Sequence, residues 1–286
     1  MSLFNPEGRP VALVTGSSSG FGLLCTVELA KAGFYVVASM RNLEKKGHVL
    51  QAAKESGVEE RIYLYRLDVA SAESVANLRA SVERWGRIDV LVNNAGFALG
   101  GFAEEVTLEE WRAQFETNFF GLVHVTQTIL PVMRERRQGR IINMSSISGQ
   151  MGFPGLSPYV SSKFAVEGFS ESLRLEVAPF GIDVVLIEPG SYATGIWSTG
   201  RRIAHKSTLC TSPYASMMSA LDSYLTAGEM KLGNPWEVAE RVAQIAVIKR
   251  AALRYPLGRG VQIIMKIKQW LPWRIWEKLM ERTLKS

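Results

Sequence analysis

The sequence predicts an α/β fold built on a doubly wound parallel sheet, and three observations support this prediction. Short apolar runs recur along the chain, helix-length segments separate them, and glycine or polar residues follow each run. Parallel strands need crossover connections, so buried strands that alternate with helices form a sheet covered on both faces. No internal repeat or low-complexity linker divides the chain, and we expect one domain over residues 1–286.

Each expected strand is a short apolar run, and the residues that follow the strand ends are the informative ones. In a sheet of this kind, ligands bind beyond the carboxyl ends of the strands, where the strand order reverses. Residues at or just after these ends are therefore expected to meet on one edge; they include Gly16, Asn93, Ser146 and Pro189. The expected strands lie within residues 11–15, 35–38, 62–67, 90–92, 141–144 and 184–187.

The composition is that of an ordinary globular protein, with 47% hydrophobic and 21% charged residues. The two cysteines, Cys25 and Cys210, have neither disulfide-framework nor zinc-site spacing, which fits a reducing interior. The three histidines, His48, His124 and His205, form no ligand spacing either, so no metal site is expected. The chain opens without a signal peptide and lacks a long apolar run, and we expect a cytoplasmic protein.

The net charge of +6 is concentrated at the C-terminal end. Residues 266–286 hold six Lys or Arg residues against two Glu residues, a net of +4, so the rest of the chain is nearly neutral. A nucleic-acid-binding protein is expected to carry a basic face across its folded body. We therefore expect no nucleic-acid partner.

A glycine-rich turn, Thr-Gly-Ser-Ser-Ser-Gly-Phe-Gly at residues 15–22, follows the first strand and opens the first helix. Glycine lets the backbone approach a pyrophosphate, and the N-terminus of the helix favours the negative charge. The alternative is a turn that only packs the helix on the sheet. The strand, turn and helix order favours a dinucleotide site made by Gly16, Ser18, Ser19, Gly20, Phe21 and Gly22.

The segment after the second strand indicates which dinucleotide binds. Sites that prefer NAD place an acidic residue there, whereas an arginine accommodates the 2′-phosphate of NADP. Residues 39–42 are Ser-Met-Arg-Asn, so Arg41 predicts NADP(H), with NAD(H) as the alternative cofactor and a solvated loop arginine as the alternative role. After the third strand, Asp68 and Val69 could contact the adenine, although Asp68 fits a turn or cap equally well.

Tyr159 and Lys163 stand four residues apart, after Ser157 as a good N-cap and Pro158 at the first helical position. Residues i and i+4 share a helix face, so the phenol and the ammonium would be neighbours. A free tyrosine has a pKa of about 10, which a nearby cation lowers. Ser146 would hydrogen-bond the oxygen that Tyr159 protonates. Taken alone, the Tyr159 and Lys163 spacing also fits an ordinary exposed helix pair.

Five groups of residues together resemble the short-chain dehydrogenase/reductase family over about residues 10–195. Their order and spacing are specific, which removes the chance explanation for Tyr159 and Lys163. The resemblance implies a Rossmann fold and an oxidoreductase that uses a nicotinamide cofactor. The groups are the glycine turn, Asn93-Asn94-Ala95-Gly96, Asn118, the trio of Ser146, Tyr159 and Lys163, and Pro189-Gly190 with Thr194.

The same resemblance implies a role for each position. Tyr159 is the expected general acid/base, Lys163 lowers its pKa and holds the nicotinamide ribose, and Ser146 orients the substrate. Asn118 would hold a water of the proton relay through its backbone, or would pack its helix. Asn93, Asn94, Ala95 and Gly96 would line the adenosine side and brace the sheet, Pro189 and Gly190 would back the nicotinamide, and Thr194 would bond its carboxamide.

Phe153-Pro154, residues 161–168 and the long C-terminal extension look most like hydroxysteroid and retinol dehydrogenases. We therefore expect an NADP(H)-dependent oxidoreductase for a bulky hydrophobic alcohol or carbonyl compound, such as a steroid, retinoid or lipid. The alternative is a catalytically silent nucleotide sensor or scaffold, against which the intact catalytic trio argues. By analogy with the family, a homodimer or homotetramer is expected through the helices that hold Asn118 and Tyr159.

Residues 191–233 lack tidy periodicity and are expected to form a helical lid over the substrate. Their aromatic and methionine side chains would make that lid apolar and adaptable, or would simply pack it on the body. The apolar side chains concerned are Tyr192, Ile196, Trp197, Leu209, Tyr214, Met217, Met218 and Tyr224.

Residues 266–286 form a basic tail with apolar side chains at near-helical spacing and Pro272 as a helix start. Such a helix can lie in a membrane interface, which would fit a lipophilic substrate, so peripheral membrane contact is one expectation. It can instead pack on its own domain or on a partner subunit. The apolar positions are Ile267, Trp270, Leu271, Ile275, Trp276, Leu279, Met280 and Leu284.

Overall fold

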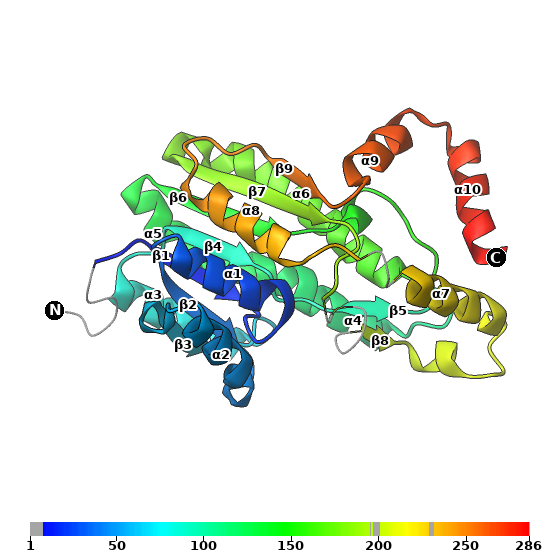
Figure 1. Cartoon of the computed structure of the whole chain (residues 1–286), viewed down its shortest axis with the longest axis horizontal. Coiled ribbons are helices and arrows are strands. Elements are labelled where there is room, and N and C mark those ends of the chain that lie inside the picture. Colours follow the sequence, from blue (N-terminus) through cyan, green and yellow to red (C-terminus); the bar gives the residue numbers. More distant parts are fainter. Residues whose placement is uncertain (1–7, 195, 197–200, 229–231, 286) are drawn as a thin grey trace.

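A seven-stranded parallel sheet forms the centre of the protein in the computed structural model, which describes residues 8–194, 196, 201–228 and 232–285 (Figure 1). The strand order is β3-β2-β1-β4-β6-β7-β9. Strands β2 and β3 are added on one side of β1 and the later strands on the other side, so the strand order reverses between β1 and β4. The doubly wound sheet predicted from the sequence is confirmed. Its strands are β1 Val11–Thr15, β2 Tyr35–Met40, β3 Ile62–Arg66, β4 Val90–Asn93, β6 Gly139–Met144, β7 Ile182–Pro189 and β9 Arg254–Leu257.

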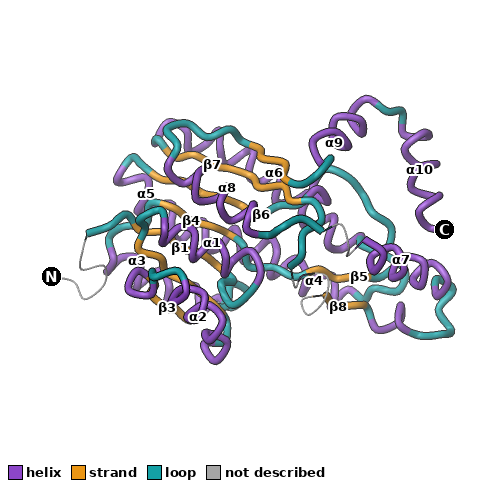
Figure 2. The backbone as a smooth tube through the Cα atoms, viewed as in Figure 1, coloured by secondary structure: helices purple, strands orange, loops and turns teal. Residues whose placement is uncertain are grey.

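Helices cover both faces of this sheet (Figure 2). Val11 and Leu13 of β1 pack in the core with α3, α5 and α6, whereas Ala12 and Val14 pack with α1 and α8. Because alternate residues of a strand point to opposite faces, a strand buried along its whole length requires this double cover. The helices are α1 Gly20–Lys31, α2 Gly47–Glu55, α3 Ala72–Trp85, α4 Leu108–Phe115, α5 Gly121–Arg136, α6 Ser157–Val177, α7 Ala215–Gly228, α8 Trp236–Val247, α9 Val261–Trp270 and α10 Trp273–Lys285.

Three strands were not predicted. The edge strand β9 pairs with β7 but lacks an apolar run and contains Pro256, which is tolerated at an edge. Strands β5 (Ala98–Gly100) and β8 (Arg201–Ile203) have three residues each and pair with one another in a separate sheet. Strands this short give no periodic signal, so only the folded chain identifies them.

The expected helical lid lies beyond the main sheet, where α7 accompanies β5 and β8 (Figure 1). An isolated bridge between Gly101 and Leu156 joins this region to the start of α6. A carbon added at Gly155 would lie 2.7 Å from Leu221 of α7, so α7 also lies close to the segment before α6. The lid is therefore attached next to the helix that carries Tyr159.

The C-terminal tail forms two helices with a break between them. α9 ends at Trp270, and α10 begins at Trp273, directly after Pro272, whose carbonyl oxygen accepts the Ile275 N–H at 2.9 Å. The predicted helix start at Pro272 is confirmed. Among the residues that the structure describes, no helix has both the length and the apolar character needed to cross a membrane.

Candidate active site

Ser146, Tyr159 and Lys163 come together at the carboxyl end of β6, and all three are buried. Ser146 follows β6, whereas Tyr159 and Lys163 lie in the first two turns of α6. A side-chain hydrogen bond joins Ser146 to Tyr159. Lys163 Nζ lies 5.7 Å from the centre of the Tyr159 ring and donates to the Met144 carbonyl oxygen at 2.7 Å. The trio predicted from spacing is therefore one cluster in the folded protein.

The predicted N-cap of α6 at Ser157 is wrong. The helix includes Ser157, and Leu156 occupies the cap position with no side-chain cap bond. The cause is visible in the backbone, because the Leu156 carbonyl oxygen accepts the first helical hydrogen bond, from the Val160 N–H at 2.9 Å. Ser157 Oγ is buried and finds no hydrogen-bond partner within the described chain. Pro158 lies in the first turn, as predicted.

Burial dominates the electrostatics of the trio. It raises the pKa of Tyr159 to about 12, against the lowering effect of the Ser146 hydrogen bond. It lowers the pKa of Lys163 to about 8, against the raising effect of the Glu167 charge. Tyr159 therefore keeps its proton at neutral pH and can donate it. The predicted lowering of the Tyr159 pKa is therefore wrong for the protein by itself, because burial outweighs the effects that lower that pKa.

Asn118 lies in a π-helical turn, Glu116–Phe120, between α4 and α5. Its Nδ2 donates to the Phe97 carbonyl oxygen at 3.0 Å and to Ser162 Oγ at 3.3 Å, and its Oδ1 accepts the Phe97 N–H at 3.1 Å. Ser162 Oγ in turn donates to the Tyr159 carbonyl oxygen at 2.7 Å. Asn118 thus connects the loop after β4 to the helix of Tyr159. Its role in a proton relay stays a prediction, although π-turns are frequent at functional sites.

The glycine turn is packed so tightly that side chains would not fit. A carbon added at Gly22 would lie 2.2 Å from the Gly16 carbonyl oxygen and 2.4 Å from Asn94 Nδ2. One added at Gly16 would lie 2.9 Å from Ala95 Cα, and Gly16 also has a positive φ of 69°. Asn94 and Ala95 therefore brace the turn. Their contact with adenosine stays a prediction.

The start of α1 is free to receive an anion. Ser19 is the N-cap but makes no side-chain cap bond, and the first turn contains no acidic residue. Among the residues that the structure describes, a carbon added at Gly20 would meet only the Thr194 side chain, at 3.9 Å, so these residues leave space above the helix N-terminus. Unpaired N–H groups and the helix dipole favour a phosphate in that space. These residues fit a dinucleotide, and the structure brings Thr194 to the same place.

The remaining residues predicted around the glycine turn have local roles. Ser18 is half-buried, and Phe21 packs its ring edge against Tyr192 with the centres 5.7 Å apart. The Gly190 N–H donates to the Leu257 carbonyl oxygen at 2.9 Å, which fixes the turn after Pro189 to β9. Gly96 is exposed beside Asn118.

Arg41 and Asp68 occupy the carboxyl ends of β2 and β3. Arg41 is exposed directly after β2. Asp68 Oδ1 accepts the Ala70 N–H at 3.1 Å, which is the turn role weighed from the sequence. Val69 is buried against Gly121, where an added carbon would lie 2.8 Å away. Adenine contact by Asp68 and Val69 stays a prediction.

Asn93 braces the sheet from inside. Its Nδ2 donates to Thr126 Oγ1 and to Asn143 Oδ1, both at 2.9 Å, and Asn143 Nδ2 donates to Ser170 Oγ at 2.8 Å. All of these side chains are buried, and the network satisfies Asn93 Nδ2 and both polar atoms of the Asn143 amide, whereas Asn93 Oδ1 finds no partner within the described chain. The bracing predicted for Asn93 is confirmed.

A buried carboxylate pair behind Lys163 was not predicted. Gln150 Nε2 donates to Glu167 at 3.0 Å and to Glu188 at 3.1 Å, and Arg254 Nε lies 3.1 Å and 3.3 Å from the same two carboxylates. Burial raises the pKa of both carboxyls, that of Glu188 to about 7. Glu167 lies four residues after Lys163 on α6, and this spacing is the sequence signal that could have found it.

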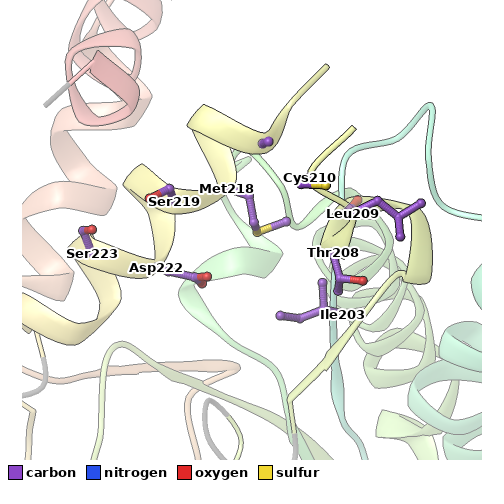
Figure 3. A pocket seen from close by; sticks show the side chains of 10 residues that line it. Ile203, Thr208, Leu209, Cys210, Met218, Ser219, Asp222 and Ser223 are labelled. Carbon is purple, nitrogen blue, oxygen red and sulfur yellow. The ribbon is translucent and has the colours of Figure 1, made fainter. Parts of the chain in front are cut away.

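A pocket of about 870 Å³ lies within the lid, between α7 and the segment after β8 (Figure 3). Ile203, Leu209 and Met218 contribute apolar lining, and Asp222 contributes a carboxylate. The described lining does not include the catalytic trio. Arg201 pairs with Asp222 at 2.7 Å and thereby joins β8 to α7.

The other predicted side chains of the lid differ in how deeply they are buried. Tyr214 stacks on Phe102 with ring centres 4.5 Å apart, and Tyr192 is buried. Ile196 and Met217 are half-buried. Trp197 lies outside the described residues, as does the side chain of Tyr224.

Comparison with known proteins identifies the family of the chain. The family model "short chain dehydrogenase" matches residues 10–202. Oxidoreductase YusZ of Bacillus subtilis is 45% identical over 97% of this chain and 99% of its own. The 3-ketodihydrosphingosine reductase of Bacteroides thetaiotaomicron is 37% identical over 92% of this chain and 93% of its own. Human retinol dehydrogenase 8 is 38% identical over 88% of this chain and 81% of its own.

Solved structures agree with these relatives. A short-chain dehydrogenase from Streptomyces avermitilis superposes with a TM-score of 0.80 at 34% identity, covering 99% of this chain and 100% of that chain. Actinorhodin polyketide ketoreductase with NADPH has a TM-score of 0.75 at 35% identity, covering 88% and 97%.

The chain belongs to the short-chain dehydrogenase family. It is an NAD(P)-dependent oxidoreductase with a Rossmann-like sheet, as the sequence motifs implied. The resemblance to retinol and hydroxysteroid dehydrogenases is matched by relatives with those names.

Proposed function

We propose that the protein transfers a hydride between NADP(H) and the hydroxyl or carbonyl carbon of a bulky hydrophobic substrate. The observation that carries this proposal is the buried contact of Ser146 with Tyr159, one helical turn from Lys163. A dinucleotide bound on the glycine turn would supply the hydride. The protein side chains would position the substrate and move the accompanying proton.

Tyr159 is proposed as the proton donor in the reduction. Its raised pKa keeps the phenol protonated, and donation to a carbonyl oxygen requires that state. Ser146, already bonded to Tyr159, would hydrogen-bond the same substrate oxygen as negative charge develops on it. The Lys163 ammonium would hold the ribose and favour the phenolate that remains after transfer.

NADP(H) is the proposed cofactor because Arg41 is exposed at the end of β2 and residues 39–42 contain no acidic side chain. A guanidinium in that place can pair with a 2′-phosphate. The NADPH complex of the 35% identical ketoreductase supports the same choice.

A hydrophobic substrate is proposed from the lid and from the relatives. Leu209 and Met218 line the lid pocket, and methionine side chains adapt to irregular apolar ligands. The names of two relatives, a 3-ketodihydrosphingosine reductase and a retinol dehydrogenase, refer to long apolar molecules. We propose that the lid supplies the apolar wall of the substrate site.

The decisive experiment is a screen of NADPH oxidation with long-chain amino ketones, retinal and steroid ketones, next to short water-soluble ketones. We expect turnover of the hydrophobic compounds, and a loss of about 10²- to 10⁴-fold in kcat for Tyr159→Phe. Equal activity of Tyr159→Phe would refute the mechanism. Tight NADPH binding without turnover of any compound would favour the silent nucleotide sensor or scaffold.

We also propose a homodimer or homotetramer. Phe120, the last residue of the π-helical turn before α5, and Phe164 and Leu175 on α6 are exposed apolar side chains on elements that contact each other. Sedimentation equilibrium should give a mass of two or four chains, and a single-chain mass would contradict the proposal.

A further inference from the structure

Residues 261–285 form an arch at the edge of the molecule, next to the end of the edge strand β9 (Figure 1). α9 continues from β9 and contacts it, and α10 turns back and contacts α7. We call this segment the C-terminal arch. It rests on the body through a few side chains, of which Val261 and Trp276 are buried.

The outer side of α9 is apolar. Ile263, Ile267 and Trp270 recur at the spacing of one helix face, and they are 66%, 46% and 87% exposed. A surface helix of a globular protein normally turns such a face inward. Apolar side chains grouped on an outer face indicate an interaction site.

Two tryptophans flank the turn between the helices of the arch. Trp270 ends α9, and Trp273, which is 60% exposed, begins α10. Lys268 Nζ lies 4.8 Å from the centre of the Trp273 ring and 5.6 Å from that of Trp276, so cation–π contacts hold the two helices together. The turn therefore presents two exposed indole rings. Tryptophan favours the boundary between lipid headgroups and acyl chains.

Basic side chains surround the exposed apolar ones. Lys266, Arg274 and Lys278 are exposed on the arch. Residues 266–286 hold a net charge of +4 out of +6 for the whole chain. An anionic lipid surface attracts such a segment, and each basic residue near the surface strengthens the attraction.

The arch has the dimensions of an interfacial segment. α9 has 10 residues and α10 has 13, whereas a helix that spans a bilayer needs about 20. A second copy of the chain fits the exposed surface of the arch less well than a lipid bilayer does. A two-fold interface would bring the same basic patch of both copies together, and like charges would oppose the contact.

We propose that the C-terminal arch docks on anionic phospholipid bilayers. Trp270 and Trp273 enter the headgroup region, and Lys266, Arg274 and Lys278 face the lipid phosphates. This inference does not rest on the proposed substrate or cofactor, because vesicle binding is measured without turnover.

The test is co-sedimentation of the full chain with vesicles of phosphatidylcholine alone or mixed with phosphatidylglycerol. We expect binding to the mixed vesicles only, and its loss at high salt. The double variant Trp270→Ala/Trp273→Ala should bind about tenfold more weakly. The triple variant Lys266→Glu/Arg274→Glu/Lys278→Glu should lose the preference for anionic vesicles. Val247→Ala removes a 61% exposed apolar side chain outside the arch and should bind like the wild type.

All substituted side chains are exposed, and Trp273→Ala keeps the contact of Lys268 with Trp276, so the thermal unfolding temperature of each variant should stay close to that of the wild type. A large drop in that temperature would identify a misfolded variant. Absence of wild-type binding to anionic vesicles would overturn the proposal. So would unchanged binding of the tryptophan variant. A lower mass of that variant in sedimentation equilibrium, without vesicle binding by the wild type, would identify a second copy as the occupant and would also overturn it.

Discussion

Asn94 donates two hydrogen bonds to Thr15, one from its backbone and one from its side chain. The Asn94 N–H donates to Thr15 Oγ1 at 3.0 Å, and Asn94 Nδ2 donates to the Thr15 carbonyl oxygen at 2.9 Å. Thr15 Oγ1 also accepts the Ala95 N–H at 3.0 Å. The end of β1 and the loop after β4 are thus fixed to one another on either side of the point where the strand order reverses.

Thr15→Val should therefore destabilise the protein. Valine keeps the shape but leaves two backbone N–H groups without an acceptor, at a cost of about 1–3 kcal/mol for each one that water does not reach. Urea unfolding should show a loss of about 2 kcal/mol, and NADPH affinity should fall because the glycine turn loses its support. Thr15→Ser keeps the hydroxyl and should lose much less. Equal losses for both variants would contradict the assigned role of Oγ1.

Gly22→Ala should disrupt the glycine turn. The added carbon would meet the Gly16 carbonyl oxygen at 2.2 Å, and backbone has to move to relieve that contact. We expect a loss of about 2 kcal/mol or more in unfolding free energy and at least about tenfold weaker NADPH binding by fluorescence titration. The matched control is Gly168→Ala on α6, where the added carbon would meet nothing within 4 Å in the described chain apart from its chain neighbours and the backbone of its own helix. Alanine is the better helix former, so Gly168→Ala should raise the unfolding free energy of the protein by up to about 1 kcal/mol.

Glu188 should make stability depend on pH. Burial and the charge of Glu167 raise its pKa from 4.5 to about 7, while Arg254 and Gln150 lower it. Between those values the folded state binds more protons than the unfolded state, so the unfolding free energy falls as pH rises through that window. The contribution is fully present below 4.5 and fully lost above 7, a change on the order of 3 kcal/mol.

Unfolding of Glu188→Gln at pH values across this window checks the assignment. The variant is neutral at every pH, so the fall with pH should flatten, and the variant should gain on the wild type as pH rises. Glu171→Gln is the control, because Glu171 pairs with the same Arg254 but is 54% exposed. An unchanged slope in Glu188→Gln would show that another group titrates.

Arg41→Ala tests the cofactor. Loss of a charge-assisted contact with a phosphate should lower kcat/KM for NADPH by about ten- to a hundredfold, with little effect on NADH. Lys54→Ala removes another exposed positive charge, on α2, and should leave the ratio of the two cofactors unchanged. A preference for NADH in the wild type would rule out the assignment of Arg41.

The sheet and the cluster of Ser146, Tyr159 and Lys163 could be predicted because their signals are local. A run such as Val11–Thr15 is apolar at every position since both faces are covered, and Tyr159 and Lys163 share one helix face. The start of α6 was misplaced by one residue because it depends on Leu156, whose partner Gly101 is far away in the sequence. No local pattern reports a contact of that kind.

The carboxylate pair illustrates the same limit inside the site. Glu167 and Glu188 lie on α6 and β7, and their closeness depends on how the helix packs on the sheet. Arg254, which approaches both, belongs to the unpredicted edge strand β9. Three residues with no common sequence motif thus form one charge cluster only after the last strand has joined the sheet.

β9 also determines how the C-terminal arch is mounted. The Leu257 carbonyl oxygen holds the Gly190 N–H, and Val261, the first residue of α9, packs against the same glycine. The first residue of the arch therefore packs against the turn that follows Pro189. Three residues separate α9 from β9 in the chain. A surface that binds the arch would therefore also fix how the proposed active site is oriented relative to that surface. The same orientation would serve both binding to the surface and uptake of substrate from it.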